Sequence, residues 1–325
     1  MNSSLPHVTI VTPMYNNAEH VEECIRSIQA QTYPSWTYLI VNNCSTDGSA
    51  EIARKHAGLD GRIRVLDNET FLRVAEANHN HALRQVPASS KYCKVVFADD
   101  WIYPRCVEEM VAVAEAHPGT ALVGAYALEG AEVKWAGLMP PSTSYPGKEV
   151  ARRYFLERLN VFGTANSLLL RTELVHKRDP FFEESDPHSD RETWIAMLRE
   201  GDYGFVHQVL TVTRLRAGSL NDEAAQLNSY LPSFLRDLQE HGRAFLTPAE
   251  YESCRDELIA EYYNFLAVSL LPRARDEEFW SYHKDRLKTL GIGFSRGRLA
   301  AAFAARATRA VLNPFETVEK MRGKR

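Results

Sequence analysis

Two adjacent aspartates, Asp99 and Asp100, directly follow the apolar run 92–98 (YCKVVFA). Neighbouring carboxylates repel each other, and burying one without a partner costs free energy. A hard divalent cation offsets this repulsion, and Mg²⁺ or Mn²⁺ commonly bridges carboxylates to the phosphates of a substrate. The pair therefore indicates a metal site for a phosphorylated ligand. The alternative is that one aspartate caps the helix that begins near Pro104, or that it faces solvent.

Short apolar segments alternate with amphipathic ones before and after these aspartates. The apolar pattern predicts strands at 8–14, 36–43, 62–67, 92–98 and 120–128. The amphipathic pattern predicts helices at 18–31, 48–57, 73–85 and 104–117. Asp47 can cap the second of these helices. Alternating strands and helices favour an α/β fold, a mostly parallel sheet with helices on both faces.

Polar residues follow three of the predicted strands. Residues 13–16 (PMYN) close the first strand, Asn42-Asn43 the second, and Asp99-Asp100 the fourth. Ligands of open α/β sheets bind beyond the carboxyl ends of the strands, so we expect these three groups to meet at one edge. The sequence has no GxxxxGK[ST] and no GxGxxG after a strand, and HExxH and GxSxG are also absent. A metal ion, rather than a Gly-rich loop, would then counter the charge of a bound phosphate.

The chain has 325 residues, a mass of 36.8 kDa, 45% hydrophobic and 25% charged residues. This length allows two domains, or one large domain with an extension. The composition argues against a disordered, collagen-like or coiled-coil chain. The net charge of −4 gives no sign of a nucleic-acid partner. It hides an asymmetry, because residues 281–325 carry eleven Lys or Arg and only three Asp or Glu.

Five cysteines occur without a CxxC pair: Cys24, Cys44, Cys93, Cys106 and Cys254. Their odd number and wide spacing favour core thiols in a reducing compartment over disulfides or a zinc site. The N-terminal residues lack a signal-peptide pattern, and no apolar run approaches the roughly 18 residues of a membrane span. We therefore expect a cytoplasmic protein, which its basic C-terminal part could bring to the inner face of the plasma membrane.

The stretch 8–49 resembles the opening of family 2 glycosyltransferases, which have the GT-A fold. The matching residues are Pro13, Tyr15, Asn16, Ser27, Gln31, Thr32, Ser45, Asp47 and Ser49. A following family block of Asn, a small residue and Leu is matched by Asn80, Ala82 and Leu83. Residues 97–104 (FADDWIYP) resemble the Asp-rich metal motif with its downstream Pro. The resemblance runs from residue 8 to about 220, roughly two thirds of the chain.

The resemblance implies an inverting, metal-dependent enzyme that uses a nucleotide-diphospho-sugar, with a UDP-sugar favoured. The segment Pro13–Tyr15 would flank the nucleobase, and Asn16 and Asn80 would belong to the donor-binding set. Asn43 stands where the family usually has an Asp that hydrogen-bonds the base. Asp99 would contact the ribose or the metal shell, and Asp100 would ligate Mn²⁺ or Mg²⁺ on the diphosphate.

The sequence departs from the family pattern at two places in this half. The usual Asp-Asp after the second strand is Asn42-Asn43. An amide donates as well as accepts, so the identity of the base stays open. Phe97 replaces the first Asp of the common metal motif, which keeps only its adjacent pair.

Residues 183–201 resemble the family's acidic motif, in which an Asp acts as general base on the acceptor hydroxyl. That Asp aligns with Asp190, and Ser189 stands where the family has Glu. Without the resemblance, Asp190 is better interpreted as the N-cap of a helix over 191–200. Asp186 and Glu192 are the nearest alternatives for the base. One base on one face would give inversion. His188 is a further candidate ligand, although an exposed loop His is more often only solvated.

Residues 162–171 are predicted to form a turn that enters a strand, and 203–213 a further strand. The family often places an Arg or His and a Ser after this last strand, on a loop over the diphosphate. The candidates here are Arg214, Arg216 and Ser219. The alternative is a solvated basic turn.

A helical extension is predicted from about residue 222, which divides the chain into a catalytic domain, 1–221, and an extension, 222–325. Residues 248–271 resemble a pair of helices. Residues 296–312 predict an amphipathic basic helix. This helix could lie on an anionic membrane surface, pack on the catalytic domain or form a homodimer interface.

The leading hypothesis is transfer of a sugar to a saccharide, lipid-linked or other hydroxyl acceptor in the synthesis of a surface polysaccharide or glycoconjugate. A sugar nucleotidyltransferase is a second hypothesis, but it usually needs a Gly-rich basic loop after the first strand, where this chain has MYNNAEH. A catalytically silent binding or scaffold protein is a third. The Asn42-Asn43 and Ser189 departures favour it, and the retained Asp99, Asp100 and Asp190 argue against it.

Overall fold

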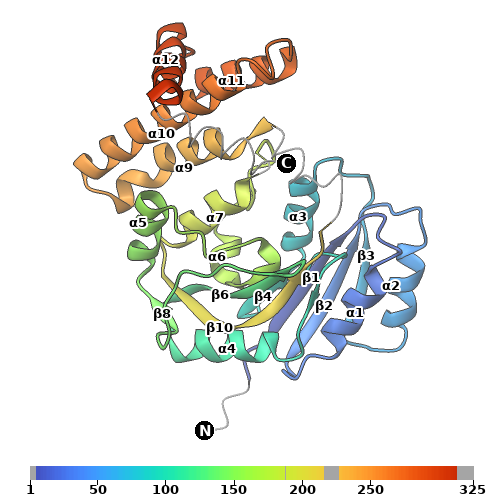
Figure 1. Ribbon diagram of the computed structural model, residues 1–325. Helices are drawn as coiled ribbons and strands as arrows, with labels where there is room; N and C mark the ends of the chain where they lie inside the picture. The colour runs from blue at the N-terminus through green and yellow to red at the C-terminus, as the bar shows by residue number, and fades with distance from the viewer. Residues whose placement is uncertain (1–4, 187, 216–226, 313–325) are drawn as a thin grey trace. The chain divides into compact units, whose positions relative to one another are not determined.

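The computed structural model describes residues 5–186, 188–215 and 227–312, and of residues 309–312 only the backbone. The chain divides into two compact units, Met1–Ser219 and Leu220–Arg325 (Figure 1). The boundary predicted after residue 221 falls among residues outside the described ranges.

The first unit is built on a ten-stranded sheet with the order β3-β2-β1-β4-β9-β6-β10-β5, where β7 pairs with β6 and β8 with β10. The strands are β1 (Val8–Met14), β2 (Trp36–Asn42), β3 (Ile63–Asp67), β4 (Tyr92–Val95), β5 (Trp101–Ile102), β6 (Thr120–Glu129), β7 (Glu132–Lys134), β8 (Ser144–Tyr145), β9 (Leu168–Arg171) and β10 (Asp202–Thr213). Strands β1, β2, β3, β4, β6 and β10 run in one direction, and β5, β7, β8 and β9 run against it. The expected mostly parallel sheet is confirmed.

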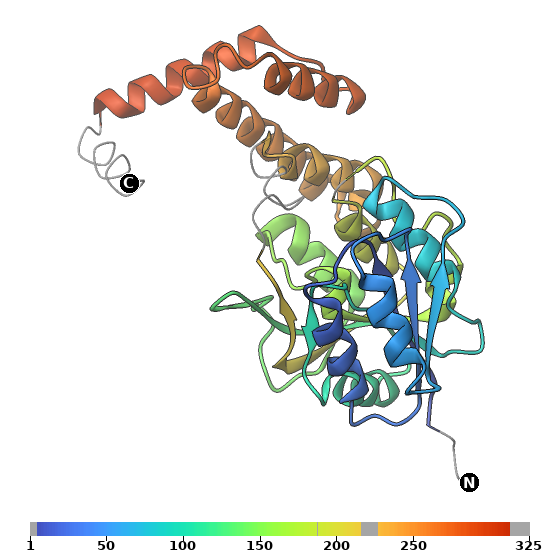
Figure 2. The ribbon, with the colours of Figure 1, turned by 90° about the vertical axis from the view of Figure 1, so that its right-hand side faces the viewer.

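Helices surround this sheet. They are α1 (Val21–Gln29), α2 (Ser49–Ala57), α3 (Ala75–Arg84), α4 (Cys106–Ala116), α5 (Gly147–Glu157), α6 (Thr172–His176) and α7 (Ser189–Met197), with a 3₁₀ turn η1 (Ala165–Ser167). Helices α1, α2 and α4 cover one face, where their apolar side chains share a core with alternate residues of β1 and β2 (Figures 1 and 2). Helix α3 packs against β1 with residues that do not belong to this core.

The sheet brings the ends of its parallel strands to one edge. Met14 pairs with Asn42, and Asn42 with Asp67, so β1, β2 and β3 end at the same level. Strand β9 is antiparallel to both β4 and β6, so the chain enters it from this same edge. The residues just before β9 therefore join the polar residues that follow the parallel strands.

The second unit is helical, as predicted. It contains α9 (Tyr230–Phe245), α10 (Pro248–Ser269), α11 (Glu277–Thr289) and α12 (Arg296–Leu312). The prediction of a helix pair over 248–271 is wrong, because one continuous helix of 22 residues spans this region. It begins at a capping box, in which Thr247 Oγ1 accepts from Glu250 N at 3.3 Å and Glu250 Oε2 accepts from Thr247 N at 2.9 Å.

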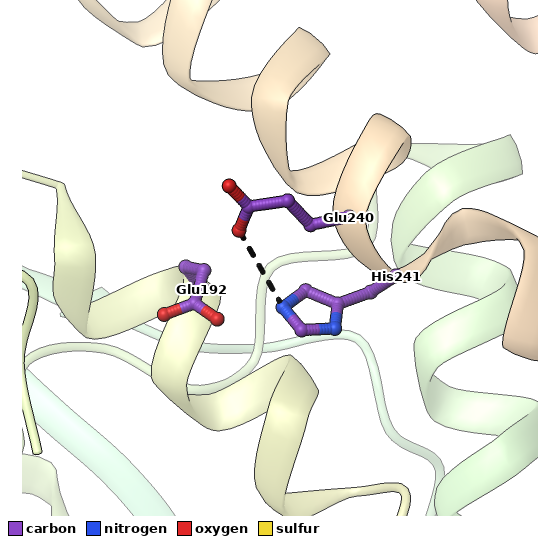
Figure 3. Close-up of side chains that lie close together, drawn as sticks. All are labelled: Glu192, Glu240 and His241. Carbon is purple, nitrogen blue, oxygen red and sulfur yellow. Dashed lines mark ion pairs between the residues drawn. The ribbon is translucent and has the colours of Figure 1, made fainter. Parts of the chain in front are cut away.

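Side-chain contacts join the helices of this second unit. The Tyr262 hydroxyl of α10 lies 2.7 Å from His283 Nδ1 of α11. Helix α10 also contacts α9 and α12. Glu240 and His241 are adjacent on α9, with 3.9 Å between Oε2 and Nε2 (Figure 3). Across the described residues, every helix is too short or too polar to cross a membrane.

Candidate functional site

The predicted metal-binding aspartates lie in a tight turn after β4. Asp100 N donates to Phe97 O at 3.0 Å, and Asp100 is almost fully buried. Its Oδ1 accepts from Arg214 N at 2.9 Å, and Arg214 Nε donates to Asp99 O at 3.0 Å. Arg214 also pairs with Glu23 of α1. The ends of β4 and β10 thus bring together three residues predicted for the site, Asp99, Asp100 and Arg214.

The donor atoms of this turn suit a hard cation. The nearby Cys24 thiol donates to Phe97 O at 3.4 Å. Burial raises the pKa of Cys24 to about 12, and the negative charges of Asp100 and Asp99 add to the shift. The thiol therefore stays protonated and is no ligand for a soft metal. The carboxylate oxygens of Asp99 and Asp100 are donors of the type that Mg²⁺ and Mn²⁺ prefer, so these residues would fit such an ion.

Asn16 joins the loop after β1 to the loop after β2. Its backbone N–H donates to Ser45 Oγ at 3.1 Å, and its Oδ1 accepts from Thr46 N at 2.9 Å. Asn16 has a φ of 48°, a left-handed conformation that Asn tolerates better than most residues. Asp47 strengthens the junction, because it accepts from Ala18 N at 2.8 Å as well as from Ser49 N at 3.0 Å. The N-cap of α2 is Gly48, without a side-chain cap, so the prediction that Asp47 caps this helix is wrong. The Asn16 side chain is thus engaged within the protein.

Asn43 is buried and pairs with the backbone of Leu72 in both directions. Its Nδ2 donates to Leu72 O at 2.8 Å, and its Oδ1 accepts from Leu72 N at 2.8 Å. Asn68 Nδ2 also donates to Asn43 Oδ1, at 3.0 Å. A carboxylate at position 43 could accept but could not donate to Leu72 O. The amide therefore secures the segment 68–72, which the sequence did not indicate.

That segment carries an aromatic ring to the end of β1. Phe71 lies against Tyr15, with ring centroids 4.7 Å apart and an interplanar angle of 40°. Both side chains are exposed, whereas Pro13 is buried within β1. The Tyr15–Phe71 pair therefore offers an exposed aromatic surface beside the polar strand ends.

Asn80 is placed differently from the other predicted donor-binding residues. Its side chain pairs with Phe182, donating to Phe182 O at 2.8 Å and accepting from Phe182 N at 2.8 Å. It also donates to Glu184 Oε1 at 3.1 Å. Asn80 thus ties α3 to the segment that precedes α7. Arg216 and Ser219 lie outside the described residues.

Asp190 lies inside the first turn of α7, so its interpretation as the N-cap is wrong. The N-cap is His188, and Asp190 Oδ1 accepts from Arg191 N at 2.7 Å. Burial raises the pKa of Asp190 to about 6, and the Asp186 carboxylate adds to the rise, while Arg191 opposes it. Burial also raises the pKa of Glu76 on α3, and the charges of Asp190 and Asp186 contribute. A carboxylate that titrates near neutral pH is suited to accept and release a proton.

The neighbours of Asp190 are engaged elsewhere. Asp186 Oδ1 accepts from His188 N at 2.7 Å. Glu192, labelled on α7 in Figure 3, is buried and ion-pairs with Arg178. His188 is buried, so the prediction of an exposed loop histidine is wrong.

A buried lysine that the sequence analysis missed holds the turn before β9. Lys94 is fully buried in β4, and its Nζ donates to Asn166 O at 2.7 Å and to Leu168 O at 3.3 Å. Asn166 Nδ2 in turn donates to Val212 O at 3.3 Å, near the end of β10. A lysine within the apolar run 92–98 was the available signal, because a buried ammonium needs acceptors.

Comparisons with known proteins agree with this fold. Residues 9–178 match the family model described as Glycosyl transferase family 2. The "Putative glycosyltransferase EpsE" of Bacillus subtilis (strain 168) is 35% identical over 261 residues, which cover 77% of this chain and 92% of that protein. The "Putative teichuronic acid biosynthesis glycosyltransferase TuaG" of the same organism is 34% identical over 100 residues, which cover 31% of this chain and 38% of that protein.

Solved structures show the same architecture. The crystal structure of S. aureus TarS 1-349 in complex with UDP-GlcNAc matches with a TM-score of 0.67 at 17% identity, covering 92% of this chain and 87% of that one. The mannosyltransferase PcManGT from Pyrobaculum calidifontis, in complex with GDP-Man and Mn²⁺, matches with a TM-score of 0.53 at 19% identity, covering 99% of this chain and 85% of that one. The sheet, the residues at its strand ends and these matches agree. The chain belongs to glycosyl transferase family 2 and has the GT-A fold.

Proposed function

We propose that this protein is an inverting, metal-dependent glycosyltransferase that uses a nucleotide-diphospho-sugar, with a UDP-sugar as the favoured donor. The observation that carries the proposal is Asp190, a partly buried carboxylate with a pKa of about 6, in the same unit as the Asp99–Asp100–Arg214 cluster. The UDP-GlcNAc in TarS and the GDP-Man and Mn²⁺ in PcManGT support the donor class and the metal.

Asp99 and Asp100 would hold Mn²⁺ or Mg²⁺, which supplies positive charge that stabilises a departing diphosphate. The Arg214 guanidinium, anchored on Asp99 O at 3.0 Å, would add its own charge beside the same phosphates. The exposed Tyr15–Phe71 surface would receive the nucleobase by stacking. Asn43 would shape this surface by holding the backbone of Leu72.

Asp190 would act as the general base. Its Oδ1 is fixed by Arg191 N, which orients the carboxylate so that Oδ2 can take the proton of the acceptor hydroxyl. The hydroxyl oxygen would attack the anomeric carbon from the side opposite the diphosphate. One displacement of this kind inverts the configuration at that carbon.

We further propose a saccharide or lipid-linked acceptor, in the synthesis of a surface polysaccharide or glycoconjugate. The support is the relative named for teichuronic acid biosynthesis, which aligns over 31% of this chain. Contact of residues 296–325 with a membrane, where such acceptors are found, would agree with this assignment.

The test compares Asp190→Asn with Asp186→Asn, a matched change four residues away. Asp190→Asn should lower the transfer rate by at least about 100-fold, because the amide cannot accept the proton. Its calorimetric affinity for UDP with Mn²⁺ should stay within about twofold of wild type. Asp186→Asn should retain most of the transfer activity.

Equal losses of binding and transfer in Asp190→Asn would contradict the role as base. Retained binding without transfer in the wild-type chain, over a panel of donors and acceptors, would favour the silent binding protein instead.

A further inference from the structure

A tryptophan with an unusual backbone covers the turn that precedes β9. Trp135 directly follows β7 and has a φ of 67°, and Gly137 follows with a φ of 137°. A bulky side chain seldom adopts the left-handed conformation, and such outliers gather at ligand sites and switch segments. The reason for this conformation is found in what the indole ring contacts.

The indole ring lies directly on Gly163. A Cβ atom at Gly163, which itself has a φ of 69°, would come within 2.6 Å of both Trp135 Cε2 and Nε1. The same position is 2.8 Å from Ser167 Oγ. Only glycine lets the ring approach this closely, so the indole N–H and the Ser167 hydroxyl converge on one point of the turn.

Several polar atoms in and over this turn lack a hydrogen-bond partner among the residues that the structure describes. These buried atoms are Trp135 Nε1, Thr164 Oγ1, Asn166 Oδ1 and Ser167 Oγ. Ser167 as a whole is fully buried. Buried polar atoms are almost always paired, so four together require an explanation. Two hydroxyls, an N–H and an amide oxygen complement sugar hydroxyls, each of which can donate and accept.

The turn also lies between the two halves of the proposed site. Asn166 bonds to Val212, two residues before Arg214, whose N–H binds Asp100. On the other side, Trp194 Nε1 of α7 donates to Gly163 O at 3.2 Å, four residues after Asp190. A sugar whose diphosphate lies at Asp100 and whose anomeric carbon faces Asp190 would have its ring at this turn.

We propose that the turn 163–167 is a subsite for the sugar of the donor, and that Trp135 covers it in the free protein. When the nucleotide sugar binds, the indole moves off Gly163. The hydroxyls of Ser167 and Thr164 and the indole N–H then bond to the sugar hydroxyls. Pairing of the orphaned polar atoms with the sugar offsets the packing that the indole loses. This subsite rests on the proposed function, because it needs a nucleotide sugar at Asp100.

The test is Ser167→Ala, because stability and binding should respond in opposite ways. Its hydroxyl makes no hydrogen bond in the free protein, so its removal should leave the unfolding midpoint unchanged or raised. The affinity for the nucleotide sugar that the wild type binds most tightly should fall about fivefold. The affinity for the matching nucleoside diphosphate alone should stay within about twofold, measured by calorimetry with Mn²⁺. Ser253→Ala is the control, because the Ser253 hydroxyl already donates to Glu257 Oε1 at 3.0 Å in the other unit.

A second measurement follows Trp135 directly. Its fluorescence should change on addition of the nucleotide sugar but not of the diphosphate, and this change should be lost in Trp135→Phe. Unchanged sugar-nucleotide affinity in Ser167→Ala, or the same fluorescence response in Trp135→Phe, would overturn the subsite and leave the proposed function intact. A wild-type chain that binds neither nucleotide would overturn the proposed function and the subsite together.

Discussion

At the scale of single residues, environment separates the roles of four carboxylates that look alike in the sequence. Asp99 and Asp100 lie in a turn beside the Arg214 backbone and side chain. Asp186 accepts from the backbone of His188. Asp190, in contrast, has a pKa raised to about 6 by burial. These environments support the different roles proposed for the four carboxylates: Asp99 and Asp100 would hold a cation, and Asp190 would exchange a proton.

The raised pKa of Asp190 predicts two opposite effects of pH. The ordinary value is 3.8 and the folded value is about 6, so folding favours the protonated form. Ionised Asp190 therefore lowers the free energy of unfolding. This loss of stability is complete at a pH above the folded pKa, and it is absent at a pH below the unfolded pKa. Asp190→Asn should be more stable than wild type by up to about 3 kcal/mol at pH 7.5, and this difference should shrink toward zero as the pH falls below 4.

Transfer by the wild type should fall about tenfold per pH unit below about 6, because the protonated carboxylate cannot accept the acceptor proton. Urea denaturation at the two pH values and a pH–rate profile measure these effects. A rate that stays flat down to pH 4.5 would argue that another group is the base.

At the scale of elements, one amide decides how the segment 68–72 meets the sheet. Asn43 at the end of β2 pairs with Leu72 N and O, and thereby holds Phe71 against Tyr15 at the end of β1. The family position is usually an Asp that contacts the base. Here the side chain is engaged with its own protein, so we expect the aromatic pair to contribute most to the binding of the base.

We therefore predict that Asn43→Asp lowers the stability of the protein, although it restores the residue that is usual in the family. The carboxylate would face Leu72 O without a proton to donate, and the free energy of unfolding should fall by about 1–3 kcal/mol. Release of Phe71 should also weaken UDP binding, as followed by thermal denaturation and calorimetry. Phe71→Leu is the matched variant, which should lose UDP affinity with little loss of stability. Tighter UDP binding by Asn43→Asp would show instead that position 43 contacts the base.

At the scale of the whole molecule, basic and acidic residues are distributed unevenly along the chain. Residues 281–325 carry eleven basic and three acidic residues, and the rest of the chain is acidic. The described part of α12 is largely exposed, including Arg298, Arg306 and the ring of Phe303. A helix with exposed cations and an exposed apolar ring is suited to an anionic lipid surface.

Removal of residues 296–325 should therefore weaken binding to vesicles that contain phosphatidylglycerol, because each basic residue near such a surface contributes about 1 kcal/mol. Flotation or sedimentation of vesicles measures the bound fraction, with phosphatidylcholine vesicles and high salt as controls. The double variant R298Q/R306Q removes two of these charges but leaves the buried Leu299 of α12 in place. If both variants bind anionic vesicles as the full chain does, the membrane assignment is wrong.

Local patterns in the sequence were sufficient for the central elements. Strands 8–14 and 36–43 and the helix 48–57 were predicted to within about one residue, because short apolar runs and the amphipathic pattern of a helix are local signals. The edge where polar strand ends meet followed from the strand directions alone. The two-residue strands β5 and β8 were not predicted, because so few residues form no clear pattern and the strands depend on pairing with β10. Helix α5, of 11 residues, was also missed.

The sequence by itself determined the family resemblance, the parallel sheet and the position of Asp99 and Asp100 at its edge. Only the tertiary structure decided what individual polar side chains do. Asn43 pairs with Leu72, Asn80 with Phe182, Lys94 with the carbonyl of Asn166, and Trp135 covers Gly163. These partners lie up to about a hundred residues apart. Strand periodicity is a property of neighbouring residues, whereas hydrogen bonding and burial depend on which distant segments the packed core brings together.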